Sequence, residues 1–300
     1  MTVFRVAAFS DGSIGGNPAG VMIAEQLPSP AKMQEIAAEI GYSETVFAAL
    51  ADNGKWTTRY YSPESEVPFC GHATIALGAV LADQFGPNIW TLSLSHTDIT
   101  IEGSQRGEIY SASLQSPPTS HSDAPSDTRN ATLDLMGYNA ADIDPQIHPA
   151  LIQAGANHIV IALNSREKLS TMHYDLDAGR ELMNKARLTT IMFVWREHER
   201  LYHARNAFAS GGVLEDPATG AAAAAFAGYL RDSGALNDGE INIVQGEDMG
   251  ARSLINARFF QHQRQFNSSI GKCALHEASN RTDPFWRTIV CNYLLWLTNF

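Results

Sequence analysis

The stretch Pro68–Leu81, PFCGHATIALGAVL, decides how the rest of this sequence is interpreted. It passes through Cys70-Gly71-His72 and then continues as an unbroken run of small and apolar residues. Such a composition predicts a tight turn that leads into a helix buried on every face. The free backbone N–H groups at the start of a buried helix need a partner in the interior, and a bound anion or oxyanion is a natural one. The stretch therefore predicts a buried helix whose first turn carries polar chemistry.

A second stretch of the same design, Asp216–Leu230, DPATGAAAAAFAGYL, lies in the later half of the chain. The elements expected around the two stretches follow the same order: a strand, an amphipathic helix, two further strands and then the turn and helix. When Ala73-Thr74 is aligned with Ala218-Thr219, the other expected elements of the two halves also align approximately. This order predicts a duplicated α+β unit, with the functional site where the two copies meet.

The fold class expected from this plan is α+β, with two similar domains. Each domain is expected to be a curled, mostly antiparallel or mixed sheet wrapped around a central apolar helix, and 300 residues suffice for two such cores. The segment 116–130, SPPTSHSDAPSDTRN, is the clearest compositional break. We therefore expect one domain at residues 1–118, a second at 130–280 and a divergent tail at 281–300, which is either a terminal helix or a subunit contact.

Bulk properties exclude several classes of protein. A net charge of -11 argues against binding to nucleic acid, which requires a basic face. The three cysteines, Cys70, Cys273 and Cys291, form neither a disulfide framework nor a C-x-x-C metal pair. No signal peptide is recognisable, and the apolar segment Ile289–Leu297 is far shorter than the ~20 residues that span a bilayer. We expect a cytoplasmic protein with no membrane partner.

Four motifs carry side chains suited to chemistry: Asn17 in GGNPAG, Glu44 in SETVF, His72 in PFCGHAT and Asp216 in LEDPATG. Each also has a purely structural interpretation. Asn17 can be a turn residue, Glu44 an exposed residue at the start of a strand, and His72 a structural histidine. Asp216 can be a helix N-cap that is followed by proline. In the functional interpretation, Glu44 is a general acid or base, and the positive end of the helix keeps His72 neutral. Cys70 is either a reactive thiolate or a small buried hydrophobe.

Taken in order, the motifs GGNPAGV, YSETVF, PFCGHAT and EDPATG resemble the PhzF-like family of phenazine-biosynthesis isomerases, which are similar in fold to diaminopimelate epimerase. The resemblance covers roughly the first 250 residues. It implies a small-molecule substrate, a homodimer, no metal and no organic cofactor. It implies that Glu44 moves the proton, with His72 and Asp216 as its catalytic partners. The substrate-binding positions that it implies are Asn17, Gly71, Thr219, Gly220 and Ala221.

The sequence departs from the family pattern in three places. The second helix opens Pro217-Ala218-Thr219-Gly220 without a thiol, so a racemase with two thiols is not expected. Ala221 stands where many relatives have serine, which argues against the phenazine intermediate itself as substrate. After QGEDMG the chain continues Ala251-Arg252-Ser253 instead of Arg-Pro-Ser, as either a divergent C-terminus or a shift of reading frame would produce.

The function expected is that of a cofactor-independent isomerase that moves a proton on a small carboxylate metabolite. Two alternatives remain open. One is a racemase or epimerase with a single thiol, Cys70. The other is a protein of the same fold that binds a metabolite without transforming it.

Overall fold

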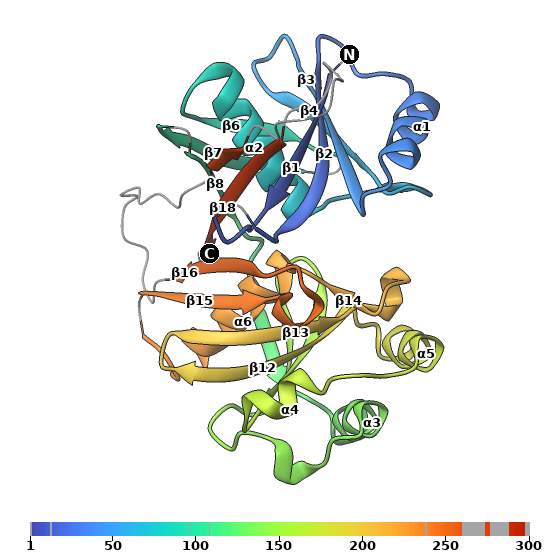
Figure 1. Cartoon of the computed structure of the whole chain (residues 1–300), viewed down its shortest axis with the longest axis vertical. Helices are drawn as coiled ribbons and strands as arrows, with labels where there is room; N and C mark the ends of the chain where they lie inside the picture. The colour runs from blue at the N-terminus through green and yellow to red at the C-terminus, as the bar shows by residue number, and fades with distance from the viewer. Residues whose placement is uncertain are drawn as a thin grey trace. The chain divides into compact units, whose positions relative to one another are not determined.

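The computed structural model describes residues 2–12, 14–95, 97–107, 109–237, 239–259, 274–276 and 288–297. The chain divides into two compact units (Figure 1). Unit 1 comprises Met1–Gln115 and Asn267–Leu294, and unit 2 comprises Ser116–Phe266 and Leu295–Phe300. In the described ranges, no helix combines the length and the hydropathy needed to cross a membrane.

Unit 1 is a mixed sheet with one helix inside it and one outside. Its elements are β1 (Val3–Ala8), β2 (Asn17–Ala24), α1 (Pro30–Ile40), β3 (Glu44–Leu50), β4 (Trp56–Tyr61), β5 (Glu66–Val67), α2 (Gly71–Phe85), β6 (Asn88–Ser93), β7 (Asp98–Arg106), β8 (Ile109–Gln115), β17 (Ala274–His276) and β18 (Thr288–Leu297). Strand β2 pairs antiparallel with β1 and parallel with β3, and α1 is the crossover that the parallel pair requires.

Unit 2 repeats this plan with additional short helices. Its elements are β9 (Ser120–Asp123), α3 (Ser126–Met136), η1 (Ala140–Asp142), β10 (Ala150–Gln153), β11 (Asn157–Leu163), α4 (Arg166–Ser170), α5 (Leu176–Ala186), β12 (Thr190–His198), β13 (Leu201–Ala207), η2 (Ala209–Gly211), β14 (Glu215–Asp216), α6 (Gly220–Asp232), β15 (Gly239–Gln245), η3 (Glu247–Met249) and β16 (Ser253–Phe259). Strand β11 pairs antiparallel with β10 and parallel with β12, as β2 does with β1 and β3.

The duplication is visible in the strand pairing and in the start of each central helix. Helix α2 begins at Gly71 after the N-cap Cys70, and helix α6 begins at Gly220 after the N-cap Thr219. Gly220 therefore corresponds to Gly71. The predicted alignment of Thr74 with Thr219 is wrong, because Thr219 precedes helix α6 whereas Thr74 lies within helix α2.

Helices α2 and α6 are buried on all faces because their residues are almost all small or apolar. The side chains of α2 are buried from His72 to Ala82, and most of those of α6 are buried as well. Gly78 lets α2 approach the sheet closely, since a Cβ at this position would lie 2.6 Å from Ile101 Cγ1 and 2.9 Å from Ala112 Cβ. The helix is thus seated directly on strands β7 and β8.

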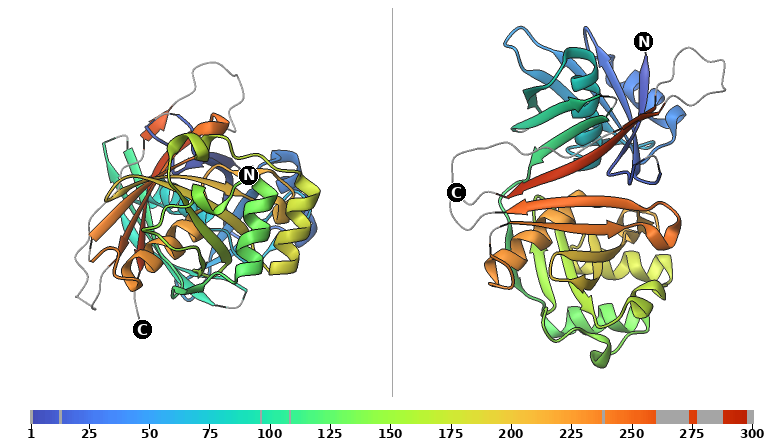
Figure 2. Two further views of the ribbon diagram at one scale, coloured as in Figure 1. Left: turned by 90° about the horizontal axis from the view of Figure 1, so that it is seen from below. Right: turned by 60° about the vertical axis from the view of Figure 1, so that its left-hand side comes forward.

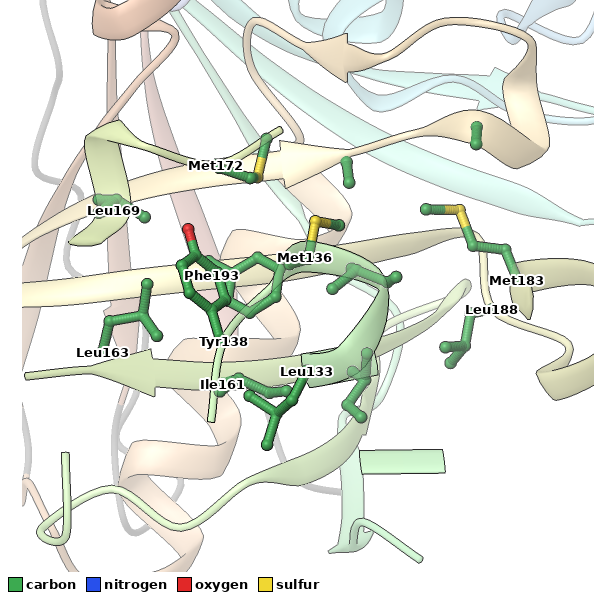
Figure 3. Close-up of a cluster of buried hydrophobic side chains, with 14 residues drawn as sticks. Leu133, Met136, Tyr138, Ile161, Leu163, Leu169, Met172, Met183, Leu188 and Phe193 are labelled. Atoms are coloured by element: carbon green, nitrogen blue, oxygen red, sulfur yellow. The ribbon is translucent and has the colours of Figure 1, made fainter. Parts of the chain in front are cut away.

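The outer face of each sheet has a core of its own. In unit 1, Met33 and Ala37 of α1 pack with Met22, Phe47 and Tyr61 of the sheet. Figure 3 shows the corresponding cluster in unit 2, where Leu133, Met136 and Met183 from the outer helices meet sheet residues such as Ile161 and Phe193. Each sheet therefore lies between a central helix and outer helices.

These observations confirm the predicted fold class: two similar α+β units, each with a mixed sheet around a central apolar helix. The sequence GGNPAG, predicted as a turn, contributes its last four residues to strand β2. Proline is tolerated there because it lies at the start of the strand. Gly20 is needed because a Cβ there would lie 2.7 Å from Thr45 Oγ1.

The structure differs from the predicted domain limits mainly near the end of the chain. The division falls after Gln115, close to the expected limit at residue 118, and the segment 116–130 already contains β9 and the start of α3. Asn267–Leu294 belongs to unit 1, because β18 pairs parallel with β1 (Figure 2). The prediction of a terminal helix in the tail is wrong for residues 288–297, which form a strand. The remainder of the tail lies outside the described residues.

The close contact at Gly78 yields a stability prediction. Replacing Gly78 with Ala should lower the free energy of unfolding by about 1–3 kcal/mol, because overpacking against Ala112 and Ile101 outweighs the gain in helix propensity. Gly71→Ala in the same helix is the matched control, since a Cβ there meets no atom within 4 Å. Chemical denaturation of both variants tests this, and equal stability of the two would contradict the packing argument.

Candidate active site

Three of the side chains singled out in the sequence meet in unit 1. Glu44 is the first residue of β3, Cys70 is the N-cap of α2, and His72 is the second residue of that helix. His72 Nε2 lies 3.4 Å from Glu44 Oε2, and His72 Nδ1 lies 3.3 Å from Cys70 Sγ. The imidazole thus stands between a carboxylate and a thiol.

The strands set the position of Glu44. In the parallel pair of β2 and β3, Ala19 lies opposite Glu44. Because side chains alternate along a strand, Asn17 is on the same face of the sheet as Ala19 and Glu44. Asn17 is buried, whereas the Glu44 side chain retains 20% of its exposure and is open to a small molecule.

Burial lowers the pKa of His72, and the nearby Glu44 carboxylate offsets this only in part. The imidazole is therefore neutral at pH 7. A neutral ring with the proton on Nε2 can turn this N–H toward the Glu44 carboxylate and accept the Cys70 thiol proton at Nδ1, so this tautomer is compatible with both neighbours. Ser43 Oγ, 3.4 Å from Nε2, is a further polar neighbour that the sequence analysis did not assign.

A buried hydrogen-bond chain holds the start of α2. The Thr74 hydroxyl donates to the Cys70 carbonyl at 2.7 Å, so the Tyr60 hydroxyl, 2.7 Å from Thr74 Oγ1, is the donor to Thr74. Burial raises the pKa of Tyr60 and keeps it a donor. The Cys70 side chain makes no capping hydrogen bond, and Gly71 follows it as the first helical residue. Such a turn presents backbone N–H groups to an anionic group.

The remaining predicted residues lie in unit 2, around the start of α6. Asp216 ends the short strand β14 and is not the N-cap, because that position belongs to Thr219. The Thr219 hydroxyl donates to Asp216 Oδ2 at 2.6 Å. Gly220 and Ala221 are the first two residues of the helix, and Ala221 is partly exposed.

Gln245, at the end of β15, fixes this turn and was missed in the sequence analysis. Its amide nitrogen donates to the Asp216 carbonyl at 2.7 Å and to Thr219 Oγ1 at 3.0 Å, and its amide oxygen accepts from the Thr219 N–H at 3.3 Å. Gln245 is completely buried. The signal that identifies it is a polar amide at the end of an apolar strand, immediately before the glycine of QGEDMG.

The chain of hydrogen bonds continues from Gln245 into the sheet. Asn206 Nδ2 donates to Gln245 Oε1 at 3.0 Å, and Thr190 Oγ1 donates to Asn206 Oδ1 at 3.0 Å. His158 Nδ1 lies 2.8 Å from Thr190 Oγ1 and is therefore the donor. Burial lowers the pKa of His158 to about 3, so this ring is neutral too. The bonds between side chains all donate in one direction, from His158 through Thr190, Asn206, Gln245 and Thr219 to the carboxylate of Asp216.

The arrangement in unit 1 is suited to proton transfer. A partly exposed carboxylate can accept a proton from a substrate and return it, and the neutral imidazole 3.4 Å away can supply an N–H to the charged form. Ligand atoms of Glu44, Cys70 and His72 all lie within 4.8 Å of one another, with the thiol beside Nδ1 and the carboxylate beside Nε2 of the ring. In unit 2, the network holds one carboxylate, Asp216, at the start of a buried helix.

Comparison with known proteins gives a consistent result. The family model described as "Phenazine biosynthesis-like protein" (PhzC-PhzF) matches residues 6–274. The uncharacterised isomerase YddE of Escherichia coli strain K12 is 31% identical over 81% of this chain and 84% of its own length. The trans-2,3-dihydro-3-hydroxyanthranilate isomerase of Pseudomonas fluorescens is 29% identical over 84% of this chain and 88% of its own. The crystal structure of a PhzF-family protein from Bacillus anthracis aligns with a TM-score of 0.73 at 20% identity, over 85% and 89% of the two chains.

The network around Gln245 leads to a second prediction. Gln245→Leu keeps the volume of the side chain but removes every partner it offers to the Asp216 turn, so buried groups lose their hydrogen bonds at about 1–3 kcal/mol each. We expect a clear fall in unfolding free energy, measured by urea denaturation. Gln26→Leu, at an exposed position, is the control. Equal stability of the two variants would show that Gln245 does not hold the turn.

Proposed function

The chain belongs to the PhzC-PhzF family of phenazine biosynthesis-like proteins and is an isomerase, and from this premise we propose that it moves a proton within a small carboxylate metabolite with Glu44 as the acid/base group. One observation carries the proposal. The Glu44 carboxylate is partly exposed and lies 3.4 Å from a buried imidazole whose lowered pKa keeps it neutral.

A neutral imidazole supports both states of the carboxylate. In this proposal its N–H faces the charged Glu44 carboxylate at 3.4 Å without the full charge of an imidazolium. Once Glu44 carries a proton, the same contact orients the acid toward the second carbon. The Cys70 thiol at Nδ1 holds the ring in the tautomer that does this.

In the proposed reaction, Glu44 removes a proton from a carbon next to an unsaturated or carboxyl-bearing centre. The electron pair of the broken C–H bond moves into the adjacent π system, and Glu44 returns the proton to another carbon. The product is an isomer, so no electrons are gained or lost overall. Backbone N–H groups at Gly71 stabilise the negative charge that develops on the substrate.

The roles of the remaining predicted residues are also part of this proposal. We assign substrate contacts to Asn17, Thr219, Gly220 and Ala221, and we propose that Asp216 assists proton transfer. The methyl group of Ala221 favours a substrate that needs no hydroxyl partner at this position. We further propose that the protein acts in the cytoplasm as a homodimer, a state that sedimentation measures directly.

Replacing Glu44 with Gln tests the role of the carboxylate. Amide and carboxyl groups have nearly the same shape, so the fold should persist, while loss of a general acid/base group should lower turnover by about 10²–10⁴-fold. The assay follows deuterium uptake from D₂O by NMR, first with trans-2,3-dihydro-3-hydroxyanthranilate and then with a panel of small unsaturated carboxylates.

Glu25→Gln is the matched control, because Glu25 is exposed and lies outside the candidate site. The acid/base role of Glu44 is refuted if Glu44→Gln turns over as fast as this control. If the native protein exchanges no C–H proton in any compound that it binds, the metabolite-binding alternative replaces the isomerase proposal.

A second mechanism has an observation in its favour, since Cys70 Sγ lies 3.3 Å from His72 Nδ1 and a thiol beside an imidazole can serve as a one-base racemase. Cys70→Ala separates the two mechanisms. Under the Glu44 mechanism we expect this variant to retain most of its turnover, because the thiol only orients the ring. Loss of turnover comparable to that of Glu44→Gln, in a variant whose thermal unfolding is native-like, would assign the chemistry to the thiol.

A further inference from the structure

A buried ion pair lies next to Asp216 in unit 2. Arg205 Nη2 donates to Glu215 Oε2 at 2.6 Å, and Arg205 Nε donates to Glu215 Oε1 at 3.1 Å. The two side chains retain only 12% and 7% of their exposure. Arg205 Nη1 donates to the carbonyl oxygens of Ser170 and Met172, at 2.9 and 3.2 Å. The guanidinium therefore joins the Glu215 carboxylate to the end of helix α4.

The ion pair and the Asp216 carboxylate lie on opposite faces of the sheet. Glu215 pairs with Ala207, a residue of the outer core, and Asp216 pairs with Asn206. Because side chains alternate along a strand, Glu215 and Arg205 lie on the outer face, and Asp216 lies on the inner face with the Asn206 network. A contact that fixes Glu215 on one face therefore also fixes the direction of Asp216 on the other.

Strand β14 depends on this contact because it contains only Glu215 and Asp216. Val213 and Leu214, which precede it, are exposed, so apolar packing does not hold the chain there. Pro217, which follows it, has no N–H to donate. The ion pair is thus the side-chain contact that ties the strand to the outer face.

Unit 1 has the matched ion pair in a weaker form. Glu66 precedes the N-cap of α2 at the same spacing as Glu215 precedes that of α6. Glu66 Oε1 lies 3.5 Å from Arg59 Nε, and the side chains of Arg59 and Glu66 retain 33% and 43% of their exposure. The residue after Glu66 is the uncharged Val67. The buried contact therefore occurs in the unit in which the next residue is a carboxylate.

We propose that Arg205 and Glu215 are positioning residues for Asp216, whose carboxylate their ion pair holds in place for proton transfer. This inference rests on the proposed function, in which Asp216 assists that step. The planar guanidinium holds both carboxylate oxygens of Glu215, which the single nitrogen of a lysine cannot reproduce. A displacement of about 1 Å in a reacting group can slow a reaction by about 100-fold.

Amide hydrogen exchange of the full-length native protein, Arg205→Lys and Glu215→Gln tests the contact without reference to turnover. The Thr219 N–H, which donates to Gln245, reports on the turn at Asp216. The slowest N–H groups of β12 report on global unfolding. We expect exchange at Thr219 to accelerate at least about tenfold more than exchange in β12. Equal acceleration of both, or no acceleration at Thr219, overturns the proposal.

Arg59→Lys and Glu66→Gln are the matched controls, because they make the same changes in the more exposed pair of unit 1. Exchange at Thr219 should stay within about twofold of native in both, since exposed ion pairs contribute little. Should Arg205→Lys and Glu215→Gln fail to fold, Glu215→Asp decides instead. It keeps the charge and shortens the side chain by one methylene, so the same selective acceleration at Thr219 is expected.

The deuterium-uptake assay tests the link to catalysis with a compound that the native protein isomerises. We expect kcat to fall by about 10–100-fold in Arg205→Lys and Glu215→Gln, and to fall by more than KM rises. A higher KM with native kcat, or native values of both, overturns the proposal. If Glu44→Gln retains native turnover, the isomerase mechanism fails, and the exchange measurement still decides whether the ion pair holds the Asp216 turn.

Discussion

Two helices buried on every side impose the constraint on which this molecule depends. Their first turns carry backbone N–H groups that have no partner within the helix, and side chains are organised around each helix start. In both units, the residue before the helix makes no capping hydrogen bond of its own. A threonine hydroxyl and a buried partner, Thr74 with Tyr60 in unit 1 and Thr219 with Gln245 in unit 2, hold the turn instead.

The duplicated units differ at matched positions where their parallel strands begin. Ala19 lies opposite Glu44 in the parallel strand pair of unit 1, and His158 lies opposite Thr190 in that of unit 2. Unit 1 has a small side chain at this position and has its ionisable groups at Glu44 and His72. Unit 2 fills the position with a neutral histidine and extends from it a chain of uncharged donors and acceptors. Gene duplication followed by divergence at matched positions explains this pattern.

The central helices, the order of the strands and the grouping of Glu44 with His72 could be predicted from sequence, because apolar composition and motif order carry that information. The polar network could not. Thr190, Asn206 and Gln245 belong to three strands that are far apart along the chain, and in sequence their side chains look like the polar residues of any sheet. The predicted alignment of the two central helices was also wrong. The motifs ATG and CGH differ in sequence, although Thr219 and Cys70 both occupy the N-cap position. Only pairing in three dimensions shows which polar side chains face one another.

The single direction of the hydrogen bonds from His158 to Asp216 has a consequence for how this part of the protein can change with time. Between the two ends, each side chain is a donor on one side and an acceptor on the other, so the identity of one dictates the polarity of the next. Conversion of Asn206 to aspartate, by mutation or by spontaneous deamidation, would place two acceptors face to face in a dry interior. An isosteric change at any one member therefore leaves a neighbour without its hydrogen-bond partner unless that neighbour changes as well.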